Sequence, residues 1–181
     1  MANVSRLEYA LLGLLQQNPQ SGYDLRKVFA MTPMRHFSDS PGSIYPALRR
    51  LEARGWITGK GEQANARKRN VYRPLAAGKR AFVEWLVGTI MRDDVLYRLD
   101  ELMLRFAFLD GNVEREKTLT FLDELEAGLD SYVKELRLFY KKFGAGIGQE
   151  TGQLAFESGI QSYEASLNWA RSARKRLERQ S

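Results

Sequence analysis

Two adjacent arginines, Arg49 and Arg50, mark the polar side of residues 38–56, a segment with the pattern of an α-helix. A guanidinium group binds a backbone phosphate or donates two hydrogen bonds to the edge of a guanine. Pro46 lies on the same side, and its ring can contact a thymine methyl group, although a proline one turn into a helix can equally be no more than a kink. These residue types predict contacts with duplex DNA. The residues of this segment that we expect at the DNA are Ser40, Gly42, Ser43, Tyr45, Pro46, Arg49 and Arg50.

A second group of cations, Arg67, Lys68 and Arg69, ends the polar segment that separates two short expected strands, at 56–58 and 71–73. Three consecutive positive charges on a polar loop suit the negatively charged backbone of a nucleic acid. A solvated loop is the alternative reading of this run. Because the run follows the helix with the two arginines, we expect these three residues to contact phosphates rather than bases.

The helix that carries the two arginines has sequence signals at both ends. Ser40 can accept a free backbone N–H of the first turn, and Pro41 follows at the first helical position, where a missing N–H costs nothing. Gly55 suits the end of the helix. At about 100° per residue, the apolar residues fall on the side opposite the arginines. This expected core side consists of Ile44, Leu48, Leu51 and Gly55, with Ala47 at its edge.

Two further helices precede this one. Apolar residues at helical spacing predict the first, from about Val4 to Asn18. Ser21 is expected to cap the second, which Pro33 stops. Three helices followed by a two-stranded hairpin with a basic end are typical of a winged helix-turn-helix, in which the third helix enters the major groove and the hairpin contacts the flanking backbone. We therefore expect a mainly α fold with a small β wing, and we assign residues 1–88, including a linking helix, to the DNA-binding domain.

The same stretch resembles the PadR family of transcription regulators over most of residues 7–86. The resemblance rests on the segments LEYALLGLLQQNPQSGYDLRKVF, SDSPGSIYPALRRLEARGWI and VYRPLAAGKRAF. Its most specific part is the run from Gly42 to Pro46, followed by Leu48 and Leu51. The resemblance implies a dimeric, DNA-binding, repressor-like regulator. Some family members release DNA on binding small aromatic acids or other hydrophobic compounds, so it also implies a small hydrophobic effector.

Residues 89–181 are expected to form a helical dimerisation domain. Two apolar stripes repeat in steps of three and four residues over 122–143 and 156–177, and the glycine-rich turn between them predicts an antiparallel helix pair. Packing within one chain, onto an expected helix at 95–109, is the alternative use of these stripes. We expect a homodimer, since two winged helices can bind both halves of a palindromic operator. The expected dimer interface is Leu7, Leu11, Leu122, Leu125, Leu129, Tyr132, Leu136, Phe156, Ile160, Tyr163 and Leu167.

Charge is distributed unevenly along the chain. Residues 1–75 contain 12 lysines and arginines against 5 aspartates and glutamates, whereas residues 76–181 contain 16 against 17. The excess of positive charge favours an anionic partner for the first part of the chain.

Several function classes find no support in the composition. The 181 residues include no cysteine and one histidine, His36. Neither a histidine-rich or thiolate metal site nor a usual nucleophile–base triad can form, so we expect no enzyme, no metal and no cofactor. The apolar run from Tyr9 to Leu15 is far short of the ~20 residues of a membrane span, and we expect a cytoplasmic protein without membrane contact. A DNA-binding transcriptional regulator is favoured over a helical protein-interaction module whose winged helix binds protein or merely packs.

Overall fold

The computed structural model describes residues 4–32, 34, 40–64, 67–146 and 148–179. The chain forms two compact units, an N-terminal unit, Met1–Leu86, and a C-terminal unit, Val87–Ser181. Pro33 and His36 lie outside the described residues. In the part of the chain that the structure describes, no helix has both the length and the apolar character needed to cross a membrane.

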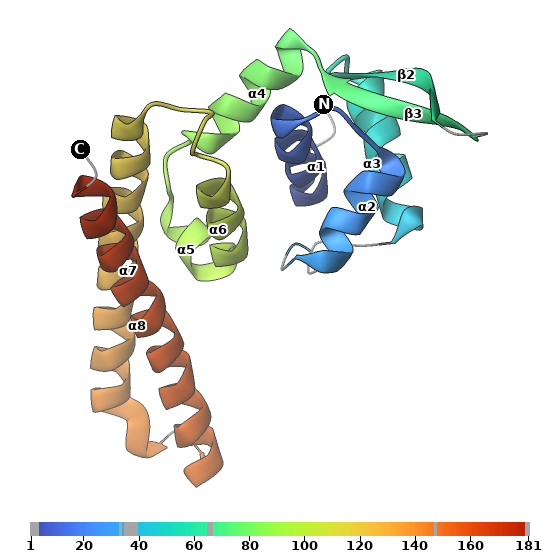
Figure 1. Cartoon of the computed structure of the whole chain (residues 1–181). Helices are drawn as coiled ribbons and strands as arrows, with labels where there is room; N and C mark the ends of the chain where they lie inside the picture. Colours follow the sequence, from blue (N-terminus) through green and yellow to red (C-terminus); the bar gives the residue numbers. More distant parts are fainter. Residues whose placement is uncertain (1–3, 33, 35–39, 65–66, 147, 180–181) are drawn as a thin grey trace. The chain divides into compact units, whose positions relative to one another are not determined.

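The N-terminal unit combines helices with a small antiparallel sheet. Its elements are α1 (Arg6–Gln17), β1 (Gln20–Ser21), α2 (Gly22–Met31), α3 (Pro41–Ala53), β2 (Ile57–Ala64), β3 (Arg67–Pro74) and α4 (Ala76–Leu86). The strand order is β1-β3-β2, and β2 and β3 form a long hairpin (Figure 1). This arrangement confirms the predicted fold class, mainly α with a winged hairpin.

Serine side chains begin the three helices that precede the hairpin. The Ser5 hydroxyl accepts the amide N–H of Glu8 at 3.2 Å, and the Glu8 carboxylate accepts the Ser5 amide at 2.9 Å. Ser21 and Asp24 form the same reciprocal pair at the start of α2. Such pairs satisfy backbone donors that the first turn of a helix leaves without a partner. The caps predicted at Ser21 and Ser40 are confirmed.

The core of the N-terminal unit lies between the apolar sides of its four helices and the start of β2. Full burial of each large apolar side chain stabilises the fold by about 1.5–3 kcal/mol relative to an exposed position. Of the residues predicted for the core side of α3, Ile44, Ala47, Leu48 and Leu51 are fully buried. Gly55, which follows the end of the helix, is exposed. The large core side chains are Leu11, Leu12, Leu15, Leu25, Phe29, Ile44, Leu48, Leu51, Ile57, Phe82 and Leu86.

The hairpin is longer than the sequence predicts. β2 and β3 are paired from Ile57, opposite Pro74, to Ala64, opposite Arg67. The prediction of short strands joined by a long loop is therefore wrong. The segment resembles a loop because polar residues and glycines are depleted in strands. The hydrogen bonds between the two strands, however, join backbone groups and do not depend on side-chain type. The sequence also misses β1, which pairs with β3 through Gln20 opposite Tyr72.

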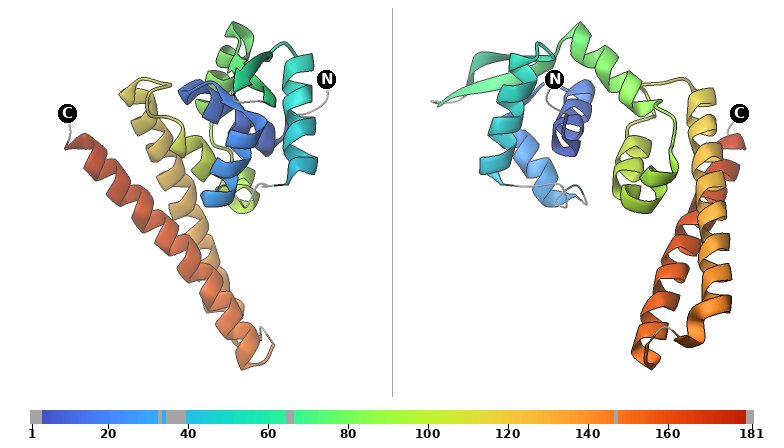
Figure 2. Two further views of the ribbon diagram at one scale, coloured as in Figure 1. Left: turned by 45° about the vertical axis from the view of Figure 1, so that its right-hand side comes forward. Right: turned by 180° about the vertical axis from the view of Figure 1, so that it is seen from behind.

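The C-terminal unit is helical in its described residues. Its elements are α5 (Arg92–Tyr97), α6 (Leu99–Ala107), α7 (Arg115–Phe143), the short 3₁₀ helix η2 (Gly144–Gly146) and α8 (Glu150–Glu178). α7 and α8 run side by side as the predicted antiparallel pair (Figure 2). The single helix predicted over 95–109 is instead two helices. They meet at Arg98, whose backbone angles (φ −138°, ψ 30°) are not helical, and neither proline nor glycine marks this break in the sequence.

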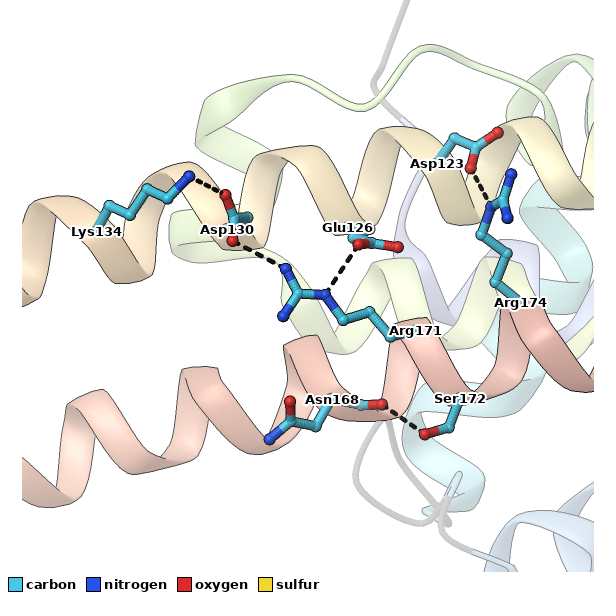
Figure 3. Close-up of polar contacts among 8 residues, drawn as sticks. All are labelled: Asp123, Glu126, Asp130, Lys134, Asn168, Arg171, Ser172 and Arg174. Atoms are coloured by element: carbon cyan, nitrogen blue, oxygen red, sulfur yellow. Dashed lines mark hydrogen bonds and ion pairs between the residues drawn. The ribbon is translucent and has the colours of Figure 1, made fainter.

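Ion pairs join the polar edges of α7 and α8. Arg171 of α8 donates to Glu126 at 2.9 Å and to Asp130 at 3.0 Å, and Arg174 pairs with Asp123 one turn further along (Figure 3). Exposed pairs of this kind contribute about 0–1 kcal/mol each. The apolar faces between the two helices therefore supply most of the free energy that holds the pair together.

Candidate nucleic-acid interface

The start of α3 is held by Ser40. Its hydroxyl accepts the amide of Gly42 at 3.2 Å, and its carbonyl accepts the amides of Ser43 at 3.0 Å and Ile44 at 3.1 Å. Pro46 lies inside the helix, where it removes one backbone donor. Because this loss falls within the first turns, the helix continues to Ala53. Ser40 therefore stabilises the start of α3, in addition to any contact that it makes with a ligand.

The two sides of α3 differ sharply in exposure. Ile44, Leu48 and Leu51 have no exposed surface, whereas Tyr45 is 40% exposed and Arg49 is also exposed. The other residues expected at DNA lie on the open side or its edges. Gly42 and Arg50 are exposed, and Ser43 and Pro46 are half-buried.

A surface groove of about 620 Å³ connects α3 with the hairpin. Three elements line it: the start of α2, the outer side of α3, and β3. The groove therefore brings the helix that carries the candidate base-reading residues next to the wing that carries the candidate phosphate-binding residues. Its lining residues are Ser21, Gly22, Tyr23, Tyr45, Arg49, Glu52, Arg69, Asn70 and Tyr72.

Tyr45 packs against the backbone at the start of α2. A Cβ atom added to Gly22 would lie 2.6 Å from the Cε1 atom of Tyr45, closer than carbon atoms approach in proteins. Glycine at position 22 thus permits the tyrosine ring to approach the backbone of α2 closely.

Glu52, at the other end of the groove, joins α3 to the base of the hairpin. Its carboxylate accepts the amide N–H of Gly59 in β2 at 2.8 Å. A Cβ atom at Gly59 would lie 2.9 Å from the ring of Tyr72, which is 7% exposed. Burial raises the pKa of the Tyr72 hydroxyl, and the nearby negative charge of Glu52 raises it further, so this group is protonated at neutral pH. The Glu52 hydrogen bond therefore joins the start of the hairpin to α3.

Arg50 has a partner within the protein that the sequence does not reveal. Its Nε atom donates to the carboxylate of Glu8 in α1 at 3.3 Å, and Arg54 approaches the same carboxylate at 3.9 Å. The Glu8 side chain is 2% exposed, whereas that of Arg50 is 50% exposed. The sequence treats Arg49 and Arg50 alike, but the structure separates them: Arg49 lines the groove, and Arg50 balances a buried charge.

The three cations expected at a flexible loop lie instead on β3. Arg67, Lys68 and Arg69 are paired with Ala64, Gln63 and Glu62 of β2, respectively. The side chains of Arg67 and Lys68 lie outside the described part of the structure, whereas Arg69 is exposed and lines the groove.

Two further cations, both on α2, lie beside Tyr23, which lines the groove; the sequence did not lead us to expect them. Arg26 and Lys27 are exposed, and their charged ends lie 5.8 Å and 5.0 Å from the centre of the Tyr23 ring. Their spacing, three and four residues after the tyrosine, is a signal that the sequence does contain. The approach of Arg69 to the same ring, at 5.1 Å, comes from the tertiary structure.

Several residues expected at a dimer interface are buried within one chain. Leu11, Leu122, Leu125 and Leu129 have no exposed surface, and Ile160 and Leu167 are 8% and 5% exposed. Leu7, Tyr132, Leu136, Phe156 and Tyr163 are half-buried. Tyr132 and Tyr163 contact each other edge to face across the helix pair, with ring centres 4.7 Å apart. The fully buried leucines have no surface left for a second copy of the chain in this conformation, because packing within their own unit already covers them.

The N-terminal unit has close relatives among known proteins. Residues 11–84 match the transcriptional regulator PadR-like family. Over these residues the chain is similar to PadR-like transcriptional regulators. The matched range contains all of α3, the whole hairpin and every residue that lines the groove.

One relative is the negative transcriptional regulator PadR of Bacillus subtilis, which is 30% identical over 121 residues. The alignment covers 66% of this chain and 65% of that protein, slightly less than two thirds of its length. A crystal structure of B. subtilis PadR with operator DNA has 22% identity and a TM-score of 0.43, covering 94% of this chain and 98% of that one. A structure of the same protein with p-coumaric acid has 21% identity and a TM-score of 0.40, covering 98% of both chains. The matched family and this relative are named as transcriptional regulators, not as enzymes.

Proposed function

We propose that this PadR-like protein is a sequence-specific DNA-binding regulator in which α3 enters the major groove and the β2–β3 hairpin lies along the flanking backbone. The observation that carries the proposal is the groove in which Tyr45 and Arg49 of α3 meet Arg69 of β3. Side chains able to contact bases thereby lie beside a side chain able to contact phosphates. The positive excess of residues 1–75 supplies long-range attraction to DNA.

Within this proposal the two arginines of α3 have different roles. Arg49 is the candidate reader of a base edge, together with Tyr45 and Pro46. Arg50 forms an ion pair with Glu8 of α1. Its exposed part can contact a backbone phosphate, but we assign it no contact with a base. Ser40, Gly42 and Ser43 lie at the start of the helix, where exposed backbone and hydroxyl groups can contact a phosphate.

The mode of action is proposed from the B. subtilis relative, which is named as a negative regulator. We propose a repressor that binds a palindromic operator as a homodimer and resides in the cytoplasm with its DNA. For the dimer surface we propose exposed apolar side chains of the C-terminal unit in place of its buried leucines. These are Leu138, Phe139, Phe143, Leu154 and Trp169, which are 38–68% exposed.

An effector belongs to the same proposal. The B. subtilis relative has been crystallised with p-coumaric acid, and we propose that a small hydrophobic or aromatic compound releases this protein from its operator. Titration of the protein–operator complex with a set of aromatic acids tests this step. Release by at least one compound at constant salt is expected, and stable complexes throughout the set would refute it.

Salt-dependent binding tests the DNA-binding proposal directly. The purified chain selects sites from a random duplex pool, and a labelled duplex carrying the selected site is then compared with a scrambled duplex by fluorescence anisotropy. The logarithm of the binding constant is expected to fall linearly with the logarithm of salt concentration, by about 0.9 for each phosphate contacted. Tighter binding of the selected duplex is expected from base contacts. Failure to bind either duplex at 50 mM salt would refute the proposal and favour a protein-interaction role.

A further inference from the structure

Three cations converge on the exposed ring of Tyr23. The charged ends of Lys27, Arg69 and Arg26 lie 5.0 Å, 5.1 Å and 5.8 Å from the ring centre. Lys27 and Arg26 come from the same helix as the tyrosine, whereas Arg69 comes from the hairpin. The ring, which is 41% exposed, therefore connects α2 with β3 at the edge of the groove.

Within the described residues, none of the three cations forms an ion pair with a carboxylate. The groove that Tyr23 and Arg69 line also contains Arg49 and one carboxylate, that of Glu52, which accepts the Gly59 amide. The face of an aromatic ring attracts a cation, but at an exposed site this attraction offsets only part of the repulsion among like charges. An anion placed beside the ring would relieve that repulsion and would accept hydrogen bonds from the lysine and arginine side chains.

We infer that Tyr23, Lys27 and Arg69 form a clamp for the DNA backbone, which we call the Tyr23 clamp. In it, Lys27 and Arg69 bind phosphodiester oxygens and Tyr23 is a positioning residue. The ring holds the two cations near each other, so that α2 and the hairpin contact the same stretch of backbone. This inference rests on the proposed DNA-binding function.

A duplex backbone suits this site better than a free phosphate ion does. The groove is open, the cations are exposed, and its volume of about 620 Å³ far exceeds that of one phosphate. A backbone running along the groove would present successive phosphates to cations from two different elements. Because backbone contacts carry no sequence information, the clamp is expected to strengthen binding to all duplexes alike.

Four single variants of the full-length chain test the clamp, with the selected and scrambled duplexes described above as probes. Tyr23→Leu removes the ring, whereas Tyr23→Phe keeps it. Lys27→Gln and Arg69→Gln each remove one charge. Arg80→Gln, an exposed cation of α4 away from the ring, controls for the loss of one positive charge. Urea unfolding of each variant verifies that the N-terminal unit is folded. If Tyr23→Leu proves unstable, Lys27→Gln still tests the clamp, because Lys27 is exposed and its replacement should not disturb the fold.

The expected results follow from the size of the contacts. Tyr23→Leu weakens binding to both duplexes by about two- to fivefold, and Tyr23→Phe restores most of the affinity. Lys27→Gln and Arg69→Gln each reduce the salt slope by about 0.9 per subunit, whereas Arg80→Gln leaves it unchanged. In a double-mutant cycle, the losses of binding free energy from Tyr23→Leu and Arg69→Gln are less than additive. Without the ring, Arg69 is no longer held in place, so its own replacement costs less.

Other outcomes would overturn the inference without touching DNA binding itself. Equal losses in Tyr23→Leu and Tyr23→Phe would show that the ring does not act through the cations. An unchanged slope in both Lys27→Gln and Arg69→Gln would remove these residues from the backbone. Competition by inorganic phosphate at constant ionic strength, abolished by Arg69→Gln, would assign the site to a free anion instead. If the wild-type chain bound neither duplex, the proposed function would fail as a whole.

Discussion

Replacement of Arg49 and of Arg50 by alanine, one at a time, should separate DNA recognition from stability. Arg49 lines the groove beside Tyr45, and a good base contact is worth about 1–3 kcal/mol. Arg49→Ala should therefore weaken binding to the selected duplex by about five- to 150-fold, with a much smaller effect on the scrambled duplex. Since Arg49 is exposed and its side chain does not enter the core, the Arg49→Ala variant should unfold at the same urea concentration as the wild type.

Arg50→Ala should have the opposite pattern. The variant removes the nearer cation from Glu8, whose carboxylate keeps its hydrogen bonds from the amide and hydroxyl of Ser5 and its approach to Arg54 at 3.9 Å. Because the Arg50 side chain is 50% exposed, solvent screens the pair and the loss is about 1 kcal/mol. For a unit of this size, that corresponds to a fall in melting temperature of about 4–8 °C. DNA affinity should change by less than threefold.

Anisotropy titrations and urea unfolding of the two variants, together with Glu8→Gln, provide the measurement. Glu8→Gln keeps the size of the side chain but removes its charge, so it should reproduce the stability loss of Arg50→Ala while leaving DNA binding intact. The reasoning would be refuted if Arg50→Ala weakened selective binding as much as Arg49→Ala at unchanged stability. In that case Arg50 would leave Glu8 on binding and read the DNA itself.

Three further substitutions probe the architecture. Gly78→Ala should destabilise the N-terminal unit by about 3 kcal/mol in urea unfolding, because the added Cβ would lie 2.2 Å from the carbonyl oxygen of Trp56. Leu129→Asp should unfold the C-terminal unit at neutral pH, as seen by circular dichroism, because it places a charge in a fully buried position. Phe139→Asp, at a position 47% exposed, should leave the helices intact but shift the sedimentation of the protein toward a 20.7 kDa monomer. A folded Leu129→Asp protein, or a Phe139→Asp protein that sediments like the wild type, would contradict the corresponding assignment.

The sequence alone determines the features of this protein that depend on neighbours within one or two helical turns. The serines that begin α2 and α3 act on amides two or three residues away, so their caps can be predicted from short patterns. The buried side of α3 follows from its periodicity for the same reason, and two regular stripes predict that α7 and α8 each carry an apolar face. The run from Gly42 to Pro46, followed by Leu48 and Leu51, is also a local pattern, and it is the most specific part of the resemblance to the PadR family.

Tertiary structure decides the features that depend on residues distant in the chain. Glu8 and Arg50 are 42 positions apart, and no local pattern separates Arg50 from Arg49 before α1 packs beside α3. The length of the hairpin is set by backbone pairing between two strands whose side chains resemble a loop. Periodicity shows that the leucines of α7 face a partner, but not whether that partner is α8 or a second chain, because the same apolar stripe satisfies either. Burial within one chain decides this for Leu129, since an apolar surface already removed from water gains nothing from further contact.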